Sequence, residues 1–221
     1  MKDKAEILAE HYQKTYELTF ELWRQRNQTF LILLAVIGAA TLLTFSAAQT
    51  NPLLVLWIAK VLEVKDEKGI QELGRSFPFG LLQSLLLVVV FYLVVNLYHR
   101  ALYVLRNYRY LAELEREIRG QLEAPPESVA FTREGGFYWS DRAGLQSAVK
   151  WCYIVLVGCL LFAFLSARIY QDFRTRTLTL AGVDLVISIA TSLFFLAYAR
   201  SSVSMDTEKA VVRSKEPPAT K

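Results

Sequence analysis

The sequence contains little of what metal centres, disulfide frameworks and many catalytic sites are built from. Its 221 residues include only two cysteines, Cys152 and Cys159, and two histidines, His11 and His99. Cysteines seven residues apart lie on the same face of one helix, where they cannot easily bridge each other. We therefore predict no disulfide and no metal site, and we interpret both cysteines as small packing residues.

Sequence patterns for nucleotide binding or covalent chemistry are also missing. The chain has no glycine-rich phosphate-binding loop and no nucleophile elbow. We therefore expect a non-enzymatic protein without a cofactor. The net charge of +4 comes from basic residues that are interleaved with acidic ones, so we expect no nucleic-acid partner.

Long hydrophobic runs are what the sequence has in abundance, since 53% of its residues are hydrophobic. About 20 apolar residues in a helix cover about 30 Å, the thickness of the hydrocarbon core of a bilayer. Four runs approach this length, at residues 29–48, 77–97, 151–167 and 178–199. We predict an all-α integral membrane protein with four transmembrane helices, whose first partner is the lipid bilayer.

The predicted spans divide the chain into five parts. In chain order they are a cytoplasmic amphipathic helix (1–28), a first transmembrane hairpin (29–97) with an interfacial segment (52–64), a cytoplasmic helix followed by a small hairpin or loop (98–148), a second transmembrane hairpin (149–199) and a disordered tail (200–221). The two glycines at 135 and 136 between alternating residues fit a β-hairpin. An irregular loop with aromatic residues at the bilayer surface fits equally well.

A helical stalk is predicted to extend from the second span, because no proline interrupts the chain between Pro78, at the start of that span, and residue 125. Apolar residues recur in this extension at steps of three or four, which is typical of an amphipathic helix. An apolar stripe needs a cover in water. We expect the N-terminal helix, a second copy of the chain or a partner protein to cover this predicted stalk interface, which consists of Val104, Tyr108, Leu111, Leu114 and Ile118.

The orientation follows from the basic residues. Most Lys and Arg lie in the N-terminal segment, in residues 98–150 and in the tail, which four spans place on one side. The positive-inside rule makes that side cytoplasmic, although these segments are also the longer ones. We expect a multi-pass plasma membrane protein, in a bacterial cytoplasmic membrane, with both termini in the cytoplasm.

Asp184 is the only acidic residue inside the predicted spans, and an ionisable group in a membrane is a functional candidate. Polar residues on other spans lie at a similar depth, and they complete a predicted intramembrane polar layer with Gln83, Ser84, Thr41 and Thr44. Ser188 and Ser192 extend the polar face of the fourth span. Asp184 can lock the helices by hydrogen bonding to Gln83 or a threonine, line a path for ions or protons, or pair with Arg174 or Arg176 near the interface. Lys150 and Arg168 are expected to snorkel from the ends of the third span.

The layout of residues 4–122 resembles that of SLATT-type two-span proteins. The shared features are an amphipathic helix, a two-span hairpin and a long following helix. The resemblance implies a membrane effector of bacterial conflict systems, while the second span pair at residues 149–199 departs from that layout.

Two functions follow from these observations. The first is a non-enzymatic scaffold, sensor or regulatory subunit that acts through the cytoplasmic stalk and forms a homo-oligomer or binds a partner protein. The alternative is an oligomeric pore or effector that conducts ions along the polar face of the fourth span.

Overall fold

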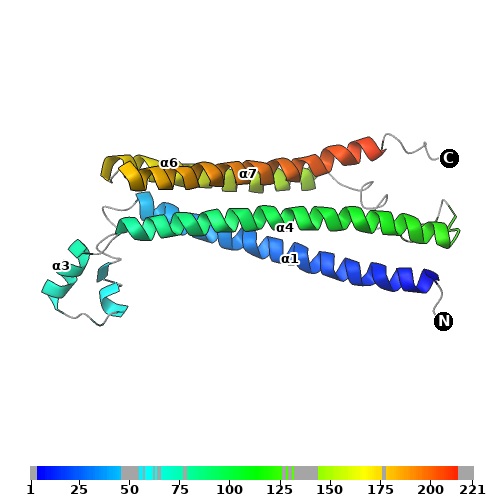
Figure 1. Cartoon of the computed structure of the whole chain (residues 1–221), viewed down its shortest axis with the longest axis horizontal. Helices are drawn as coiled ribbons and strands as arrows, with labels where there is room; N and C mark the ends of the chain where they lie inside the picture. The colour runs from blue at the N-terminus through cyan, green and yellow to red at the C-terminus, as the bar shows by residue number, and fades with distance from the viewer. Residues whose placement is uncertain are drawn as a thin grey trace. The chain divides into compact units, whose positions relative to one another are not determined.

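The chain folds into long helices in the computed structural model shown in Figure 1. The structure describes residues 4–45, 55, 56, 58–61, 63, 66–76, 79–125, 128, 131, 144–175 and 178–213. Its helices are α1 (Lys4–Phe45), α3 (Glu67–Ser76), α4 (Phe79–Gln121), α6 (Gly144–Thr175) and α7 (Leu178–Arg213). No strand occurs among the described residues, so the all-α prediction is confirmed.

Four helices are long and apolar enough to cross a membrane. The described residues contain candidate spans within Glu6–Thr44, Gly80–Gln121, Trp151–Arg174 and Leu180–Ser202. They belong to α1, α4, α6 and α7, the helices in which the four spans were predicted. These helices indicate a membrane protein.

Helices α1 and α4 are each about twice as long as a membrane crossing needs. They contain 42 and 43 residues, which correspond to about 65 Å at 1.5 Å per residue, against about 30 Å of hydrocarbon. Neither contains a proline, so nothing stops the helix between its polar and apolar parts. Each helix is therefore one uninterrupted element in which an apolar part adjoins a polar one.

The chain divides into two compact units, and each of the four long helices contributes to both. Unit 1 consists of Met1–Phe30, Val95–Val155 and Phe194–Lys221. Unit 2 consists of Leu31–Val94 and Leu156–Leu193.

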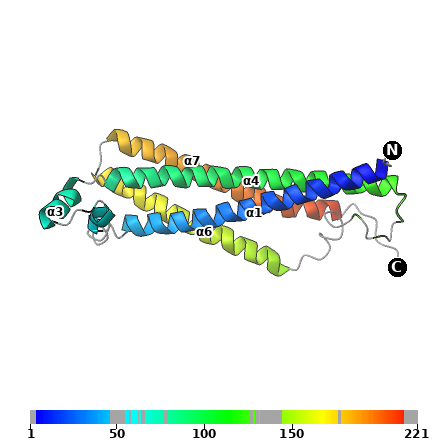
Figure 2. The same ribbon diagram turned by 90° about the horizontal axis from the view of Figure 1, so that it is seen from below.

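In unit 1, α1 and α4 run antiparallel and side by side, as both views show (Figures 1 and 2). The hydroxyl of Tyr12 donates a hydrogen bond to Glu115 Oε1 at 2.8 Å. Further along α1, Gln25 Oε1 accepts a hydrogen bond from Arg100 Nη1, also at 2.8 Å. Residue numbers rise along α1 as they fall along α4, which establishes the antiparallel pairing.

The predicted stalk interface on α4 is covered within the chain itself. Val104, Leu111, Leu114 and Ile118 are buried, with at most 5% of their surface exposed, and Tyr108 is half-buried. Burying a side chain such as leucine contributes roughly 1.5–3 kcal/mol relative to leaving it in water. The stripe is therefore part of the core of unit 1.

Unit 2 is a bundle of four helix segments around an apolar core. Large buried side chains come from all of α1, α4 and α6, and include Leu33, Ile37, Leu87, Val90, Leu161 and Phe164. The outward side chains are apolar as well, among them Leu31, Leu42, Leu81, Leu85, Val186 and Leu193. A segment that is apolar on both its inner and outer faces is typical of a bundle surrounded by lipid.

Two helices extend beyond their predicted ends. The sequence predicts a turn at residues 168–177, but α6 continues to Thr175, with Arg168 and Asp172 on its buried side. The tail predicted to be disordered from residue 200 instead continues α7 to Arg213, because residues 200–213 contain neither glycine nor proline. Residues 214–221 lie outside the described part of the chain.

Three smaller predictions also need comment. The sequence predicts a solvated turn at residues 65–69, but α3 begins at Glu67, and Asp66 Oδ2 accepts a hydrogen bond from the Gly69 backbone N–H at 2.8 Å, as an N-cap does. Cys152 and Cys159 are free and exposed, so their predicted role as packing residues is wrong. The hairpin or loop at residues 127–141 lies almost entirely outside the described residues, as does part of the interfacial segment 52–64.

The buried stripe can be tested by truncating one leucine. Leu111→Ala should lower the free energy of unfolding by about 2–5 kcal/mol, because a buried leucine leaves a cavity when it is shortened. The matched control is Leu122→Ala, since Leu122 is 48% exposed. Thermal unfolding in detergent, followed by circular dichroism, measures both variants. Equal melting temperatures for the two variants would show that the stripe is not a core.

Candidate functional site

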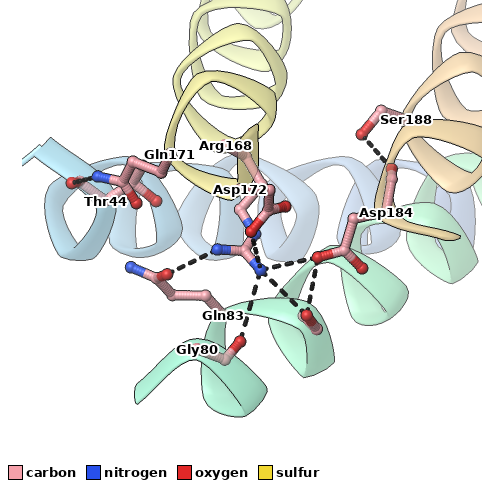
Figure 3. Close-up of polar contacts among 9 residues, drawn as sticks. Thr44, Gly80, Gln83, Arg168, Gln171, Asp172, Asp184 and Ser188 are labelled. Carbon is pink, nitrogen blue, oxygen red and sulfur yellow. Dashed lines mark hydrogen bonds and ion pairs between the residues drawn. The ribbon is translucent and has the colours of Figure 1, made fainter. Parts of the chain in front are cut away.

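The polar groups of unit 2 converge on one arginine, Arg168 of α6, which is the largest fully buried side chain among the described residues (Figure 3). Its Nη2 forms an ion pair with Asp184 Oδ2 of α7 at 2.7 Å and with Asp172 Oδ1 of α6 at 3.0 Å. At most 6% of each of these three side chains is exposed. The cluster therefore joins α6 to α7 through charges that have no access to water.

Helix α4 supplies the neutral half of the same cluster. Arg168 Nη1 donates a hydrogen bond to Gln83 Oε1 at 2.7 Å, and Nη2 donates to Ser84 Oγ at 3.0 Å. Ser84 in turn donates its hydroxyl hydrogen to Asp184 Oδ2 at 2.8 Å. Arg168, Ser84 and Asp184 thus close a ring of hydrogen bonds that connects three helices.

One nitrogen of the cluster serves more acceptors than it has hydrogens. Nη2 of a guanidinium carries two hydrogens. Three oxygens accept hydrogen bonds from it, namely those of Asp184, Ser84 and the Gly80 carbonyl, and Asp172 Oδ1 lies 3.0 Å away as an ion-pair partner. The three acceptors must share these two hydrogens. Nε of Arg168 is buried and has no hydrogen-bond partner among the described residues.

Local sequence explains why these side chains meet. Arg168 and Asp172 are four residues apart on α6, so they lie one above the other on one face. Ser84 and Asp184 each lie within the first two turns of their helices, α4 and α7. The C-terminal end of α6 and the N-terminal ends of α4 and α7 all belong to unit 2. The polar residues near these ends therefore lie at the same level.

Aromatic residues on α6 indicate how deep the cluster lies. Trp151 and Tyr170 are exposed near opposite ends of the apolar part of this helix, and nineteen residues of helix correspond to about 28 Å. Exposed Trp and Tyr residues with this separation match the two interfaces of a bilayer. Arg168 lies two residues before Tyr170, or about 3 Å inside the apolar interval.

At this depth the cluster must neutralise its own charge. The adjoining parts of α1 and α4 supply no counter-charge, because residues 27–59 and 76–98 contain no charged side chain. The exposed residues at this level, such as Leu85 and Val183, are apolar. Removing one partner of a buried ion pair costs about 3–5 kcal/mol, because an uncompensated charge then stays buried.

The predicted threonines are used differently. Thr41 and Thr44 donate their hydroxyl hydrogens to carbonyls one turn earlier in α1, at 2.7 Å and 2.8 Å. Gln171 Nε2 donates to the backbone carbonyl of Thr44 at 2.6 Å, which ties the end of α1 to α6. The structure therefore brings together Asp184, Ser84 and Gln83 of the predicted layer, but not the hydroxyl groups of the threonines.

The polar face of α7 is satisfied within its own helix. Ser188 and Ser192 donate to the carbonyls of Asp184 and Ser188, at 2.7 Å and 2.9 Å. Ser188 is buried and Ser192 is half-buried. A serine bonded one turn back has used its single hydrogen, so its hydroxyl can act only as an acceptor toward other groups.

Sequence reasoning missed the centre of the site. Arg168 does not snorkel from the end of α6, and Asp184 pairs with Arg168 rather than with Arg174. The guanidinium of Arg174 lies 5.5 Å from the ring of Tyr170, and Arg176 is outside the described residues. The available signal was the spacing of Arg168 and Asp172, four residues apart in a segment that extends an apolar run.

Among the described residues, no group of three or more His, Cys, Asp or Glu side chains is placed to hold a metal ion.

Comparisons of the chain with protein-family models, with curated proteins and with solved structures found no match.

The charge balance of the cluster can be tested with paired substitutions. Arg168→Leu should destabilise the protein by about 3–5 kcal/mol, since two buried carboxylates lose their counter-charge. Replacing Arg168, Asp172 and Asp184 together by leucine should recover most of that loss, because no buried charge remains.

Arg174→Leu is the control, because Arg174 is exposed on the same helix, and it should change stability by at most about 0.5 kcal/mol. Thermal unfolding in detergent compares all three variants. A triple variant that is no more stable than Arg168→Leu would contradict this account of the cluster.

Proposed function

We propose that the protein is a non-enzymatic membrane scaffold, sensor or regulatory subunit that acts through a cytoplasmic helical stalk. The stalk consists of residues 4–26 of α1 and residues 98–121 of α4. The membrane is a bacterial cytoplasmic membrane, and both termini are in the cytoplasm. The observation that carries the proposal is that α4 holds Arg168 near its first turns and continues as one helix into the stalk.

The Arg168 cluster supports a conformational role better than a chemical one. Both terminal nitrogens of Arg168 are engaged by groups of the protein. The hydroxyl of Ser84 accepts a hydrogen bond from Arg168 and donates one to Asp184. It is therefore already bonded within the protein on both its donor and its acceptor side. The shared Nη2 favours exchange between its acceptors, so a small shift of α6, α7 or α4 changes which bonds are made.

The stalk supports a role in recognition. The apolar stripe of α4 is buried, whereas α1 exposes Leu18 and Phe20. His11 and Tyr110 meet at an exposed position, with Nε2 and the hydroxyl 2.8 Å apart. A second copy or a partner protein would contact the outward side of the stalk, because Leu111 and Ile118 are already buried.

Coupling between the Arg168 cluster and the stalk can be measured with a cysteine pair. In a background with Cys152→Ala and Cys159→Ala, the substitutions His11→Cys and Tyr110→Cys place thiols on facing sides of α1 and α4. Because cysteine is shorter than either ring, a disulfide between them forms only when fluctuations bring the two helices closer. Adding Arg168→Gln should change the rate of disulfide formation several-fold, because α4 links the two regions. Gel mobility after mild oxidation measures that rate.

Arg174→Gln is the matched control, since it removes an exposed arginine from the same helix. The sensor proposal fails if Arg168→Gln lowers the melting temperature but leaves the rate of disulfide formation equal to that of the control. The cluster would then stabilise the bundle without communicating with the stalk.

The alternative function is an oligomeric pore, and one observation favours it. Asp184, Ser188 and Thr191 are all buried, so one face of α7 brings polar groups into the bundle. An ion path would need these groups to be free for the ion. The hydroxyls of Ser188 and Thr191 donate to their own helix, and Asp184 is bonded to Arg168.

Ion flux separates the two functions. Purified protein in liposomes should give no potassium or proton flux above that of empty vesicles, because the polar face is closed by internal bonds. A dye-based flux assay measures this, with Asp184→Asn as the companion variant. Flux in the wild type that Asp184→Asn abolishes would establish the pore and overturn the scaffold proposal.

A further inference from the structure

A row of exposed aromatic and basic side chains lies on one face of α4, just beyond the apolar part of the helix. His99, Tyr103 and Arg106 are spaced by four and three residues, so they lie on one face, and all three are exposed. The rings of His99 and Tyr103 meet edge to face, with their centroids 4.7 Å apart. The same face continues toward the first turn of α4 with exposed apolar residues, which are Leu81, Leu85, Val88 and Tyr92.

Arg106 differs in its contacts from Arg100 and Arg119 of the same helix. Arg100 donates to Asn96 and Gln25, and Arg119 donates to the carbonyl of Ser128. Arg106 makes no hydrogen bond or ion pair within the part of the chain that the structure describes. Its guanidinium is therefore available to an anion from outside the protein.

The position of Arg106 favours an anion at the membrane surface. Residues 76–98 carry no charge, and Arg106 follows Leu97 by nine residues, or about 13 Å along the helix. Side chains of an α-helix lean toward its N-terminus, and in α4 the N-terminus is the apolar end. The long side chain of Arg106 therefore reaches back toward the headgroup layer, which is about 5–8 Å thick on each side of the hydrocarbon.

We propose that His99, Tyr103 and Arg106 form a binding site for the phosphate-bearing headgroup of an anionic phospholipid. The guanidinium of Arg106 pairs with the phosphate, and the hydroxyl of Tyr103 donates a hydrogen bond to it. The ring of His99 supports that of Tyr103. The exposed apolar residues of the same face, from Leu81 to Tyr92, contact the acyl chains. One face of α4 therefore contacts both the headgroup and the acyl chains of the lipid.

Charges further along the helix limit the site to the membrane-proximal part. The exposed face of α4 continues with Glu113 and Glu117, which repel an anion. Anionic lipid attracts basic residues close to the surface and loses this effect within a Debye length of about 8–10 Å. The sequence of charges along the face thus complements a headgroup at Arg106 and disfavours one further out.

Native mass spectrometry of the detergent-purified full chain tests this site. We expect the protein to retain phosphatidylglycerol in preference to phosphatidylcholine, and Arg106→Gln to weaken retention of phosphatidylglycerol about fivefold. The matched control is Arg116→Gln, since Arg116 is exposed on the same helix and lies about 15 Å further from the membrane. This control should bind like the wild type.

Three outcomes would overturn the proposal. One is equal retention of the two lipids, and another is equal loss of phosphatidylglycerol from both arginine variants. The third is displacement of phosphatidylglycerol by millimolar inorganic phosphate, which would assign the site to a soluble anion. Tyr103→Phe provides a second variant if Arg106→Gln is not helical by circular dichroism. It removes only the hydroxyl, and unchanged retention of phosphatidylglycerol would also count against the site.

Discussion

A charge inside an apolar bundle must find its counter-charge within the protein, and Arg168 shows how unit 2 meets this constraint. Its guanidinium is fully buried and contacts carboxylates on α6 and α7 together with polar groups on α4. Each contact removes part of the cost of keeping the charge out of water. The charge balance of the cluster therefore depends on groups from all three helices.

Units 1 and 2 satisfy their polar groups in different ways. In unit 2 the hydroxyls of Thr41, Thr44 and Ser188 bond to their own helices, and the groups that reach across between helices are mainly those of the Arg168 cluster. In unit 1 many polar contacts lie at the surface, as for His11 and Tyr110, and an apolar stripe forms the core. A bundle in lipid gains little from burying apolar side chains, so its polar contacts carry the specificity. A helix pair in water gains its stability from the apolar stripe.

The sequence was sufficient to predict the all-α fold and the four apolar helices, since each depends on local composition. Ser84 bonds to Asp184, whereas Gln83 bonds to Arg168. The sequence was not sufficient for Arg168. A basic residue at the end of an apolar run can place its charged group in water or form a buried ion pair. The position of Asp184 on α7 decides between the two, and the sequence does not give that position. The extension of α6 was missed for the same reason, because Asp172 reads as part of a turn until its partner one helical turn away is known to be buried. The stripe from Val104 to Ile118 was recognised from its periodicity, whereas its cover depended on tertiary structure.

The antiparallel pairing of α1 and α4 is an association within one chain. It therefore does not depend on how many copies of the protein are present. A second copy of α1 would have to compete for α4 with a helix whose effective concentration is about millimolar.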